Sequence, residues 1–213
     1  MKTRTVADFV PFVEITFAGA APSTIQNAIR ETIVTFMRET RAAADMLYLD
    51  AACGQVDHVL DTPECRRLVG VEAVYRQPPK GGAWTPDWQM IPMSDMTRSL
   101  AGWWMDDTGG PNATLWVYPR SASPARYAVR YSWAIGRDNC DVPEWIYEDY
   151  EPTITAGALA MLHANPQDQS SDLKFALMQN AAFTQGVAAA RARRLAQYRG
   201  RKMRITTLNF YGG

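Results

Sequence analysis

An adjacent acid and base, Asp57-His58, is the first place in the sequence where the residue types could do chemistry. A carboxylate beside an imidazole can help to move a proton, which is what general acid–base catalysis requires. No neighbouring Ser or Cys completes a nucleophilic arrangement. The other histidine, His163, falls late in an expected helix, where an imidazole favours the last carbonyl groups. We therefore interpret Asp57-His58 as a surface loop pair and His163 as structural, predict no catalytic residue, and rank an enzyme that uses Asp57-His58 last among the hypotheses.

Cysteines and acidic runs also give no metal or cofactor signature. Cys53, Cys65 and Cys140 are an odd number without a CxxC spacing, which argues against a disulfide framework and a four-thiolate metal site. Glu148-Asp149-Tyr150-Glu151 and Asp106-Asp107 are the densest acids, but no EF-hand loop surrounds them. None of the glycine pairs belongs to a GxGxxG or phosphate-binding loop. The sequence therefore predicts a protein that is not an enzyme and holds neither metal nor cofactor.

Charge is balanced over the chain but not along it. The 213 residues carry 22 basic and 22 acidic side chains, so the formal net charge is zero. Residues 1–137 are neutral, residues 138–172 carry eight acidic side chains and no basic one, and residues 173–213 carry eight basic side chains and no acidic one. Such segregation indicates electrostatic partners that the total charge hides.

The basic C-terminal part allows three interpretations. Seven Arg and Lys residues lie within the fourteen positions of 191–204. They could contact phosphate groups of a nucleic acid. They could simply be a solvated helix end, favoured by the helix dipole. They could also meet the acidic stretch 138–151 of a neighbouring subunit, since opposite charges set the register of an assembly.

Three segments carry the periodicity of amphipathic helices. Apolar residues recur every three to four positions over about 23–43. A second helix is predicted over about 141–165, with Asp141 as its cap and a kink or break at Pro152. The third runs over about 171–198 and is rich in alanines, which favour helix and permit close packing.

The middle of the chain indicates strands and turns instead. Apolar residues alternate from Val69 to Tyr75 and, more clearly, from Tyr127 to Ile135. This period of two is typical of a half-buried strand. The middle also contains six of the seven tryptophans, and Trp is enriched at protein interfaces.

These elements predict an α+β fold. An α-helical bundle, made of the N-terminal helix and two C-terminal helices, would comprise residues 1–45 and 138–200. A β-rich insert would cover 46–137, and an extended C-terminal arm 201–213. No apolar run reaches the roughly 18–20 residues of a membrane span. The first residues have no continuous apolar stretch after Lys2 and Arg4, so we expect no secretory signal.

Several short segments, taken in chain order, carry a resemblance to a known family. They are Pro22, Ala28-Ile29-Arg30, Phe36 and Thr40; Trp103, Thr108-Gly109-Gly110-Pro111-Asn112 and Tyr118-Pro119; the strand over 126–135; Val142-Pro143-Glu144-Trp145-Ile146, the stretch 154–162 and Asn165-Pro166; and Phe183 with 188–194. This order resembles the head-to-tail adaptors of tailed bacteriophages, the tail tubular protein A-like head–tail connectors. The resemblance covers about residues 9–200, and Pro152 departs from the family's uninterrupted helix.

The resemblance implies a structural virion protein without catalytic residues. Adaptors of this kind form a homo-oligomeric ring, usually of twelve subunits, beneath the portal protein of the filled head. The helical bundle forms the ring body, the C-terminal arm reaches the portal, and the β-rich insert projects toward the tail nozzle protein. DNA passes through the channel without sequence recognition. The expected location is the head–tail interface of the virion, after assembly in the host cytoplasm and with no membrane contact.

Three sets of residues are predicted to make the contacts of such a ring. Arg201, Lys202, Arg204, Ile205, Leu208, Phe210 and Tyr211 would form the arm that contacts the portal. Asp141, Glu144, Glu148 and Asp149 would pair with Arg191, Arg193 and Arg194 of a neighbouring subunit. Trp84, Trp88, Trp103 and Trp104 would face the tail. The alternative function is a nucleic-acid-binding protein that uses the basic C-terminal helix.

Overall fold

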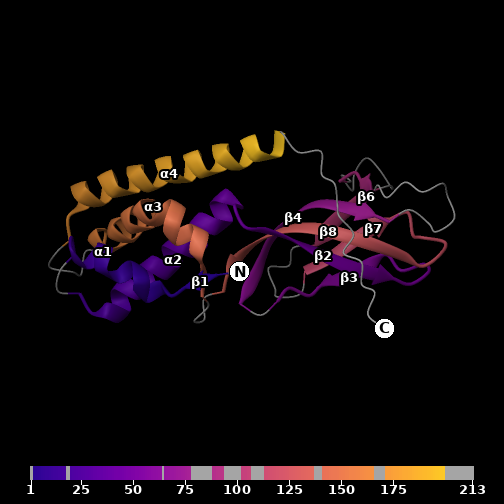
Figure 1. Cartoon of the computed structure of the whole chain (residues 1–213), viewed down its shortest axis with the longest axis horizontal. Coiled ribbons are helices and arrows are strands. Elements are labelled where there is room, and N and C mark those ends of the chain that lie inside the picture. The colour runs from indigo at the N-terminus through magenta and orange to yellow at the C-terminus, as the bar shows by residue number, and fades with distance from the viewer. Residues whose placement is uncertain are drawn as a thin grey trace. The chain divides into compact units, whose positions relative to one another are not determined.

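The computed structural model describes residues 2–17, 20–63, 65–77, 88–93, 102–106, 113–136, 141–165 and 171–199. They divide into two compact units. The helical unit comprises Met1–Ala43, Pro63–Val69 and Trp133–Gln197, and the sheet unit is formed mainly by Ala44–Thr62 and Gly70–Ser132. Figure 1 labels the helices and strands of both units.

Helices α2, α3 and α4 form most of the helical unit. Its elements in chain order are β1 (Thr3–Arg4), the 3₁₀ helix η1 (Val6–Phe9), α1 (Val10–Glu14), α2 (Pro22–Thr40), β9 (Val142–Pro143), α3 (Glu144–His163) and α4 (Leu173–Arg199). In α2 the apolar periodicity places Ile25, Ile29 and Ile33 on one fully buried face. Arg41, with a left-handed backbone at φ 49°, ends this helix. The helix predicted over about 23–43 is thus confirmed, with its end three residues earlier.

The start of α3 differs from the prediction. Asp141 does not cap the helix, because Val142–Pro143 is extended and pairs with Thr3–Arg4 as a two-stranded antiparallel sheet. The Asp141 carboxylate instead accepts a hydrogen bond from the Thr3 hydroxyl at 3.1 Å. The helix then begins at Glu144 and continues through Pro152, so no break occurs there.

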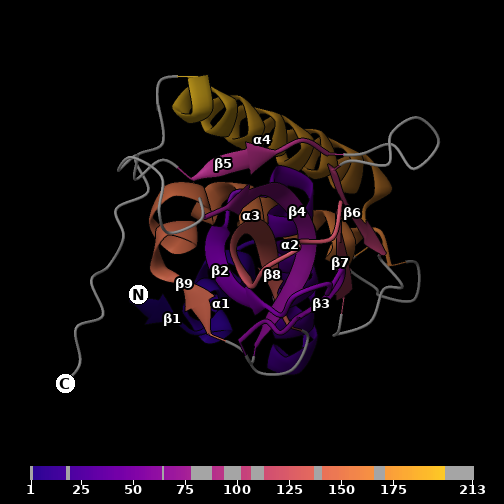
Figure 2. The ribbon, with the colours of Figure 1, turned by 90° about the vertical axis from the view of Figure 1, so that its right-hand side faces the viewer.

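The sheet unit is built from two antiparallel sheets. Its strands are β2 (Ala44–Ala51), β3 (Asp57–Leu60), β4 (Arg66–Arg76), β5 (Gln89–Ile91), β6 (Gly102–Asp106), β7 (Ala113–Tyr118) and β8 (Ala125–Ile135). The larger sheet has the order β2-β8-β4-β5, and the smaller sheet has the order β3-β7-β6 (Figure 2). The first residues of β4 and the last residues of β8 belong to the helical unit.

Strand β8 is more deeply buried than its alternation predicts. Tyr127, Val129 and Tyr131 are buried, as expected for one face, but Ala128 and Ser132 on the opposite face are buried too. The strand lies between β2 and β4 in the larger sheet. The predicted strand is correct, whereas its predicted half-burial is wrong, because a central strand can be covered on both faces.

The predicted fold class, a helical bundle with a β-rich insert, is wrong. The described residues form an α+β, β-rich fold with three antiparallel sheets and about 33% strand. Period-two alternation in the sequence predicted individual strands, but it did not predict how far each strand extends along the chain. The 11-residue strands β4 and β8 run on into the helical unit, which also holds the β1–β9 pair. The predicted arm, 201–213, lies outside the described residues.

Candidate functional site: an assembly surface on the helical unit

Two glycines allow the helices of the helical unit to approach closely. A Cβ atom added at Gly157 in α3 would clash with the methyl group of Thr32 in α2 and lie 2.8 Å from the Phe183 ring in α4. A Cβ atom added at Gly186 in α4 would clash with Thr153 in α3. Side chains of the neighbouring helices thus pack directly against the backbone at both glycines, and a residue with a Cβ atom would have to displace them.

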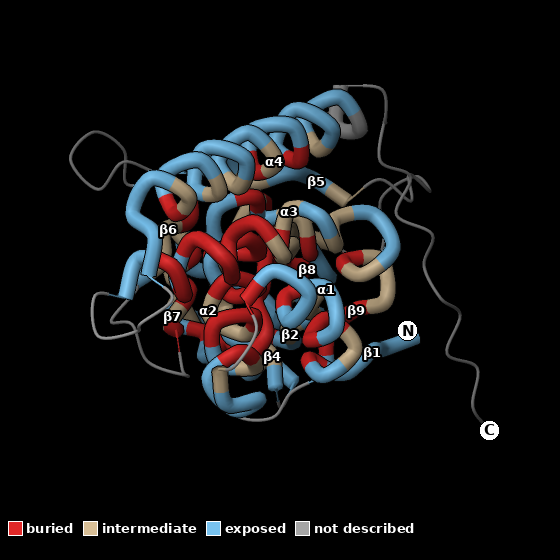
Figure 3. The backbone as a smooth tube through the Cα atoms, turned by 90° about the vertical axis from the view of Figure 1, so that its left-hand side faces the viewer, coloured by how far each residue is buried: buried red, intermediate tan, exposed pale blue. Residues whose placement is uncertain are grey.

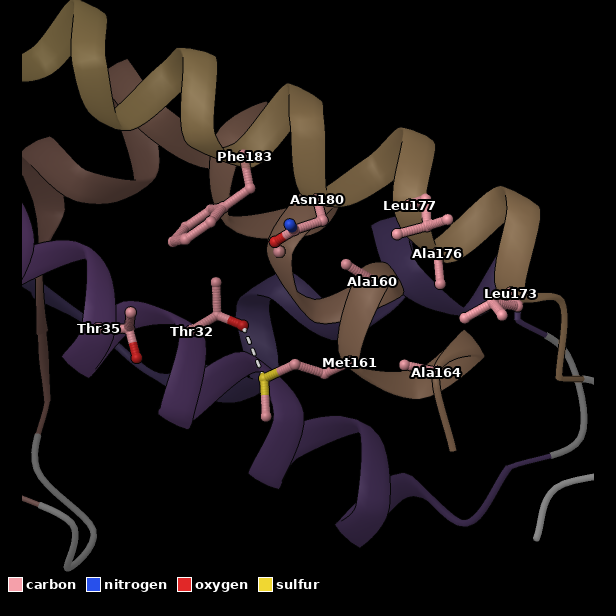
Figure 4. A pocket seen from close by; sticks show the side chains of 11 residues that line it. Thr32, Thr35, Ala160, Met161, Ala164, Leu173, Ala176, Leu177, Asn180 and Phe183 are labelled. Atoms are coloured by element: carbon pink, nitrogen blue, oxygen red, sulfur yellow. Dashed lines mark hydrogen bonds between the residues drawn. The ribbon is translucent and has the colours of Figure 1, made fainter. Parts of the chain in front are cut away.

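Beside these contacts, helices α2, α3 and α4 line a groove of about 450 Å³ that is open to solvent. We call it the interhelical groove. Figure 4 shows side chains of α2, α3 and α4 gathered around it. Its lining residues are small or apolar and none is charged: Thr32, Thr35, Gly157, Ala160, Met161, Ala164, Leu173, Ala176, Leu177, Asn180 and Phe183. The Thr32 hydroxyl lies 2.8 Å from the Ala28 carbonyl, to which it donates within α2, and 3.5 Å from the Met161 sulfur of α3 (Figure 4). The groove can therefore accept apolar side chains but offers no group for acid–base chemistry.

Exposed apolar side chains lie along the groove and along α4. Leu173 and Leu177 are 69% and 63% exposed, and Met161 on α3 is 48% exposed. Met178 and Leu195 of α4 are exposed as well. Single exposed leucines are ordinary, but an apolar groove edged by several of them is typical of a surface that another protein covers.

Helix α4 itself is thinly packed. Of its 27 residues, those buried in the described part are Ala176, Val187 and Ala190, which are all small or medium in size. Figure 3 shows α4 mostly exposed, in contrast to the buried face of α2. Because helices in proteins are stabilised mainly by packing of an apolar face, so little burial favours a further contact in an assembly.

The arginines of α4 contact the end of α2 in the same chain. Arg191 Nε donates to the Glu39 carbonyl at 2.6 Å, and its guanidinium also pairs with the Glu39 carboxylate. Arg194 Nη1 donates to the Thr40 carbonyl at 3.1 Å. These carbonyl groups belong to the last turn of α2, where the helix leaves its acceptors without internal partners. The two arginines thus act as a C-terminal cap for a neighbouring helix.

The remaining charged residues predicted to pair between subunits lie in the helical unit, and some of them contact other residues of this unit. Arg193 lies 4.0 Å from the Asp149 carboxylate and 5.6 Å from the Tyr150 ring centre. The Glu144 carboxylate is 3.4 Å from Arg4 and 3.8 Å from Lys2. Glu148 is exposed. One predicted pair, Arg193 with Asp149, is therefore made within one chain. Arg191 and Glu144 have other partners in the same chain, and pairing between subunits stays a prediction.

The predicted tail-facing tryptophans fall into different environments of the sheet unit. Trp103 is buried and donates from Nε1 to the Ile91 carbonyl at 3.1 Å, so it is a core residue. Trp104 is half-buried, and Trp88 lies 6.0 Å, between ring centres, from Tyr48. Trp84 and the seven predicted portal-contact residues at 201–211 lie outside the described residues.

Asp57 and His58 do not form a catalytic pair. They are successive residues of β3, so their side chains point to opposite faces of the strand, and the structure buries His58 while leaving Asp57 exposed. The imidazole packs 5.4 Å from the Tyr127 ring centre. Burial lowers the pKa of His58, and the charge of Asp57 partly opposes this shift. His58 is therefore a core residue that favours the neutral form. The interpretation of Asp57-His58 as a surface loop pair is wrong, because both residues belong to strand β3 and His58 is buried.

The described residues lack the features of a membrane-spanning helix and of a metal site. None of these helices combines the length and apolar character that crossing a membrane requires. Within the same ranges, no group of three or more His, Cys, Asp or Glu side chains could hold a metal ion.

No protein-family model matches the chain, and no curated protein sequence matches it. The resemblance to phage adaptors therefore stays a prediction that rests on the order of the motifs.

Sequence reasoning missed the residues of the interhelical groove. The relevant signal was the small residues Ala156-Gly157-Ala158 and Ala160, together with Gly186, on helices that were expected to pack together. Small residues mark close approach, but which side of α3 meets α4 depends on the tertiary structure.

Proposed function

We propose that the protein is a structural adaptor that assembles into a ring and joins the portal of a phage head to the tail. The order of the sequence motifs suggests the class of protein. The observation that carries the proposal is the interhelical groove with its exposed leucines, because it is an apolar surface with no chemistry of its own. Such a surface suits contact with another protein.

A ring needs two different, complementary surfaces on each subunit, since its contacts are heterologous. The groove supplies one of them. Phe12 and Ile15, at and just after α1, supply candidates for the other, because they are 37% and 84% exposed. The ring would then be held by apolar side chains of one subunit that enter the groove of the next.

The described charges favour this proposal over a nucleic-acid-binding protein. Arg191, Arg193 and Arg194 contact Glu39, Asp149 and the Thr40 carbonyl of the same chain. Arg191 and Arg193 are 49% and 59% exposed, but Glu39 and Asp149 partly balance their charges within the chain, which leaves less charge to attract a phosphate backbone. These contacts support a role of the arginines in the stability of the helical unit.

The test is the mass of the complex that the protein forms with its portal, measured by light scattering. Wild-type protein is expected to bind in many copies per portal. Leu177→Asp, which places a charge at the groove, is expected to lose this assembly, whereas Gln185→Asp on the same helix keeps it. A wild-type protein that does not bind the portal would overturn the proposed function. Equal assembly by Leu177→Asp would instead show that the groove is not the contact.

A further inference from the structure

The smaller sheet of the sheet unit has one buried face and one outer face. On the buried face are His58, Leu60, Leu115 and Trp103. Alternation along the strands places a different set on the opposite side: Asp57 of β3, Trp104 and Asp106 of β6, and Trp116 and Tyr118 of β7. We call these five residues the aromatic–acidic face. They are exposed or half-buried in the structure.

Its three aromatic rings are nearly parallel. Trp104 lies directly opposite Trp116, with ring centres 6.0 Å apart and planes 6° apart. The Tyr118 ring centre lies 5.0 Å from that of Trp104, with planes 13° apart. Cross-strand aromatic pairs stabilise a sheet, which explains part of this arrangement. They also leave a row of partly exposed π systems on the outer face.

Two carboxylates lie on the same face as the rings. Asp57 is opposite Trp116 in the strand pairing, and Asp106 is two residues from Trp104 on the same face. Both aspartates are exposed. None of the strands β3, β6 and β7 contains a Lys or Arg residue. This face is therefore negative and rich in π electrons.

We propose that the aromatic–acidic face binds an extended, arginine- or lysine-bearing segment of a partner protein. A guanidinium or ammonium group is attracted to the face of a Trp or Tyr ring and pairs with a carboxylate. Both kinds of acceptor lie on this face, so charge complementarity selects a cationic partner. A nucleic acid does not fit, because its phosphates would meet Asp57 and Asp106. The proposal does not depend on the proposed ring assembly.

The test uses the full-length protein and two labelled octapeptides, Ser-Arg repeated four times and Ser-Gln repeated four times. Binding is measured by fluorescence anisotropy at low salt. The arginine peptide is expected to bind at least tenfold more tightly than the glutamine peptide, and added salt should weaken it. Equal binding of the two peptides would overturn the proposal.

Matched variants test whether binding of the arginine peptide depends on this face or on the overall charge of the protein. The double variant Asp57→Asn and Asp106→Asn changes two exposed side chains, so it should keep the fold while weakening the arginine peptide at least fivefold. The control, Asp45→Asn with Asp50→Asn, makes the same charge change on β2 of the larger sheet and should leave binding within twofold of wild type. Equal losses in both double variants, or no loss in the first, would contradict the assignment. Circular dichroism and thermal melting verify that each variant is folded.

The rings provide a second, independent readout. Trp104→Leu should weaken the arginine peptide at least threefold, because a leucine keeps apolar volume but removes the π system. A neutral oligosaccharide that binds in a Trp104-dependent way, while the arginine peptide does not, would overturn the cationic assignment and identify a sugar-binding face.

Discussion

The helical and sheet units present different kinds of surface. In the helical unit, charged groups such as Arg191 and Glu39 contact each other within the chain, and α4 exposes several large apolar side chains, among them Leu177 and Leu195. In the sheet unit, the outer face of the smaller sheet combines aromatic rings with carboxylates. Apolar surface gives non-directional attraction that grows with area, whereas rings and charges select a partner by its chemistry. The two proposals therefore assign assembly to the helical unit and recognition of a cationic partner to the sheet unit.

The largest expected effect is a difference in stability between substitutions on the two faces of the smaller sheet. Trp103→Leu removes a buried indole and its hydrogen bond to the Ile91 carbonyl, and should lower the free energy of unfolding by about 3 kcal/mol. Trp104→Leu on the outer face should cost only about 1 kcal/mol. Urea titrations followed by circular dichroism measure both values. Similar losses would mean that Trp104 is also a core residue.

A second effect tests the close packing of the helical unit. Gly157→Val introduces side-chain atoms where even a Cβ atom clashes with Thr32, and should destabilise the unit by about 2 kcal/mol. Ala188→Val, at an exposed position of α4, provides the control and should cost less than about 1 kcal/mol. A Gly157→Val protein as stable as the control would show that α2, α3 and α4 are further apart than described.

A smaller effect is expected at the end of α2. Arg191→Ala removes two contacts with Glu39, but the pair is about half-exposed, so the loss should be about 1 kcal/mol. High salt should reduce the difference from wild type. Lys174→Ala, also on α4, should have no measurable effect. If the two variants unfold at the same urea concentration, the arginine does not stabilise this helix end.

The smallest expected effect is a pH dependence in the sheet unit. The pKa of His58 is lowered by burial from its ordinary 6.5, so the unfolded chain binds a proton at a higher pH than the folded chain does. Stability should therefore fall as the pH drops below about 6.5. His58→Leu should remove this part of the dependence, which urea titrations at pH 7.5 and 5.5 can measure. The same dependence in wild type and variant would assign it to other groups.

Local periodicity predicted elements better than it predicted burial or partners. The helix α2 follows from apolar residues at three- and four-residue steps, and these steps depend only on helix geometry. Asp141 fits a capping sequence equally well, yet Thr3 and Arg4, nearly 140 residues earlier in the chain, pair with the following residues and hold them extended. A contact of that separation leaves no local signal.

The candidate sites also depend on contacts that the local sequence does not reveal. The neighbours Trp103 and Trp104 have identical chemistry, and only the alternation of β6 separates the core residue from the outer one. Charge segregation correctly drew attention to Arg191 and Arg193, but a linear sequence does not show whether Glu39, Asp149 or another subunit supplies the opposite charge. The interhelical groove depends on how three helices meet, which residue types alone do not determine.

The most direct test of the central claim, that the helical unit forms a ring, is a projection image of the protein bound to its portal. The account predicts a closed ring with rotational symmetry for wild type and for Gln185→Asp, and single or irregular particles for Leu177→Asp. Portal particles that carry no added ring in any sample would contradict the account.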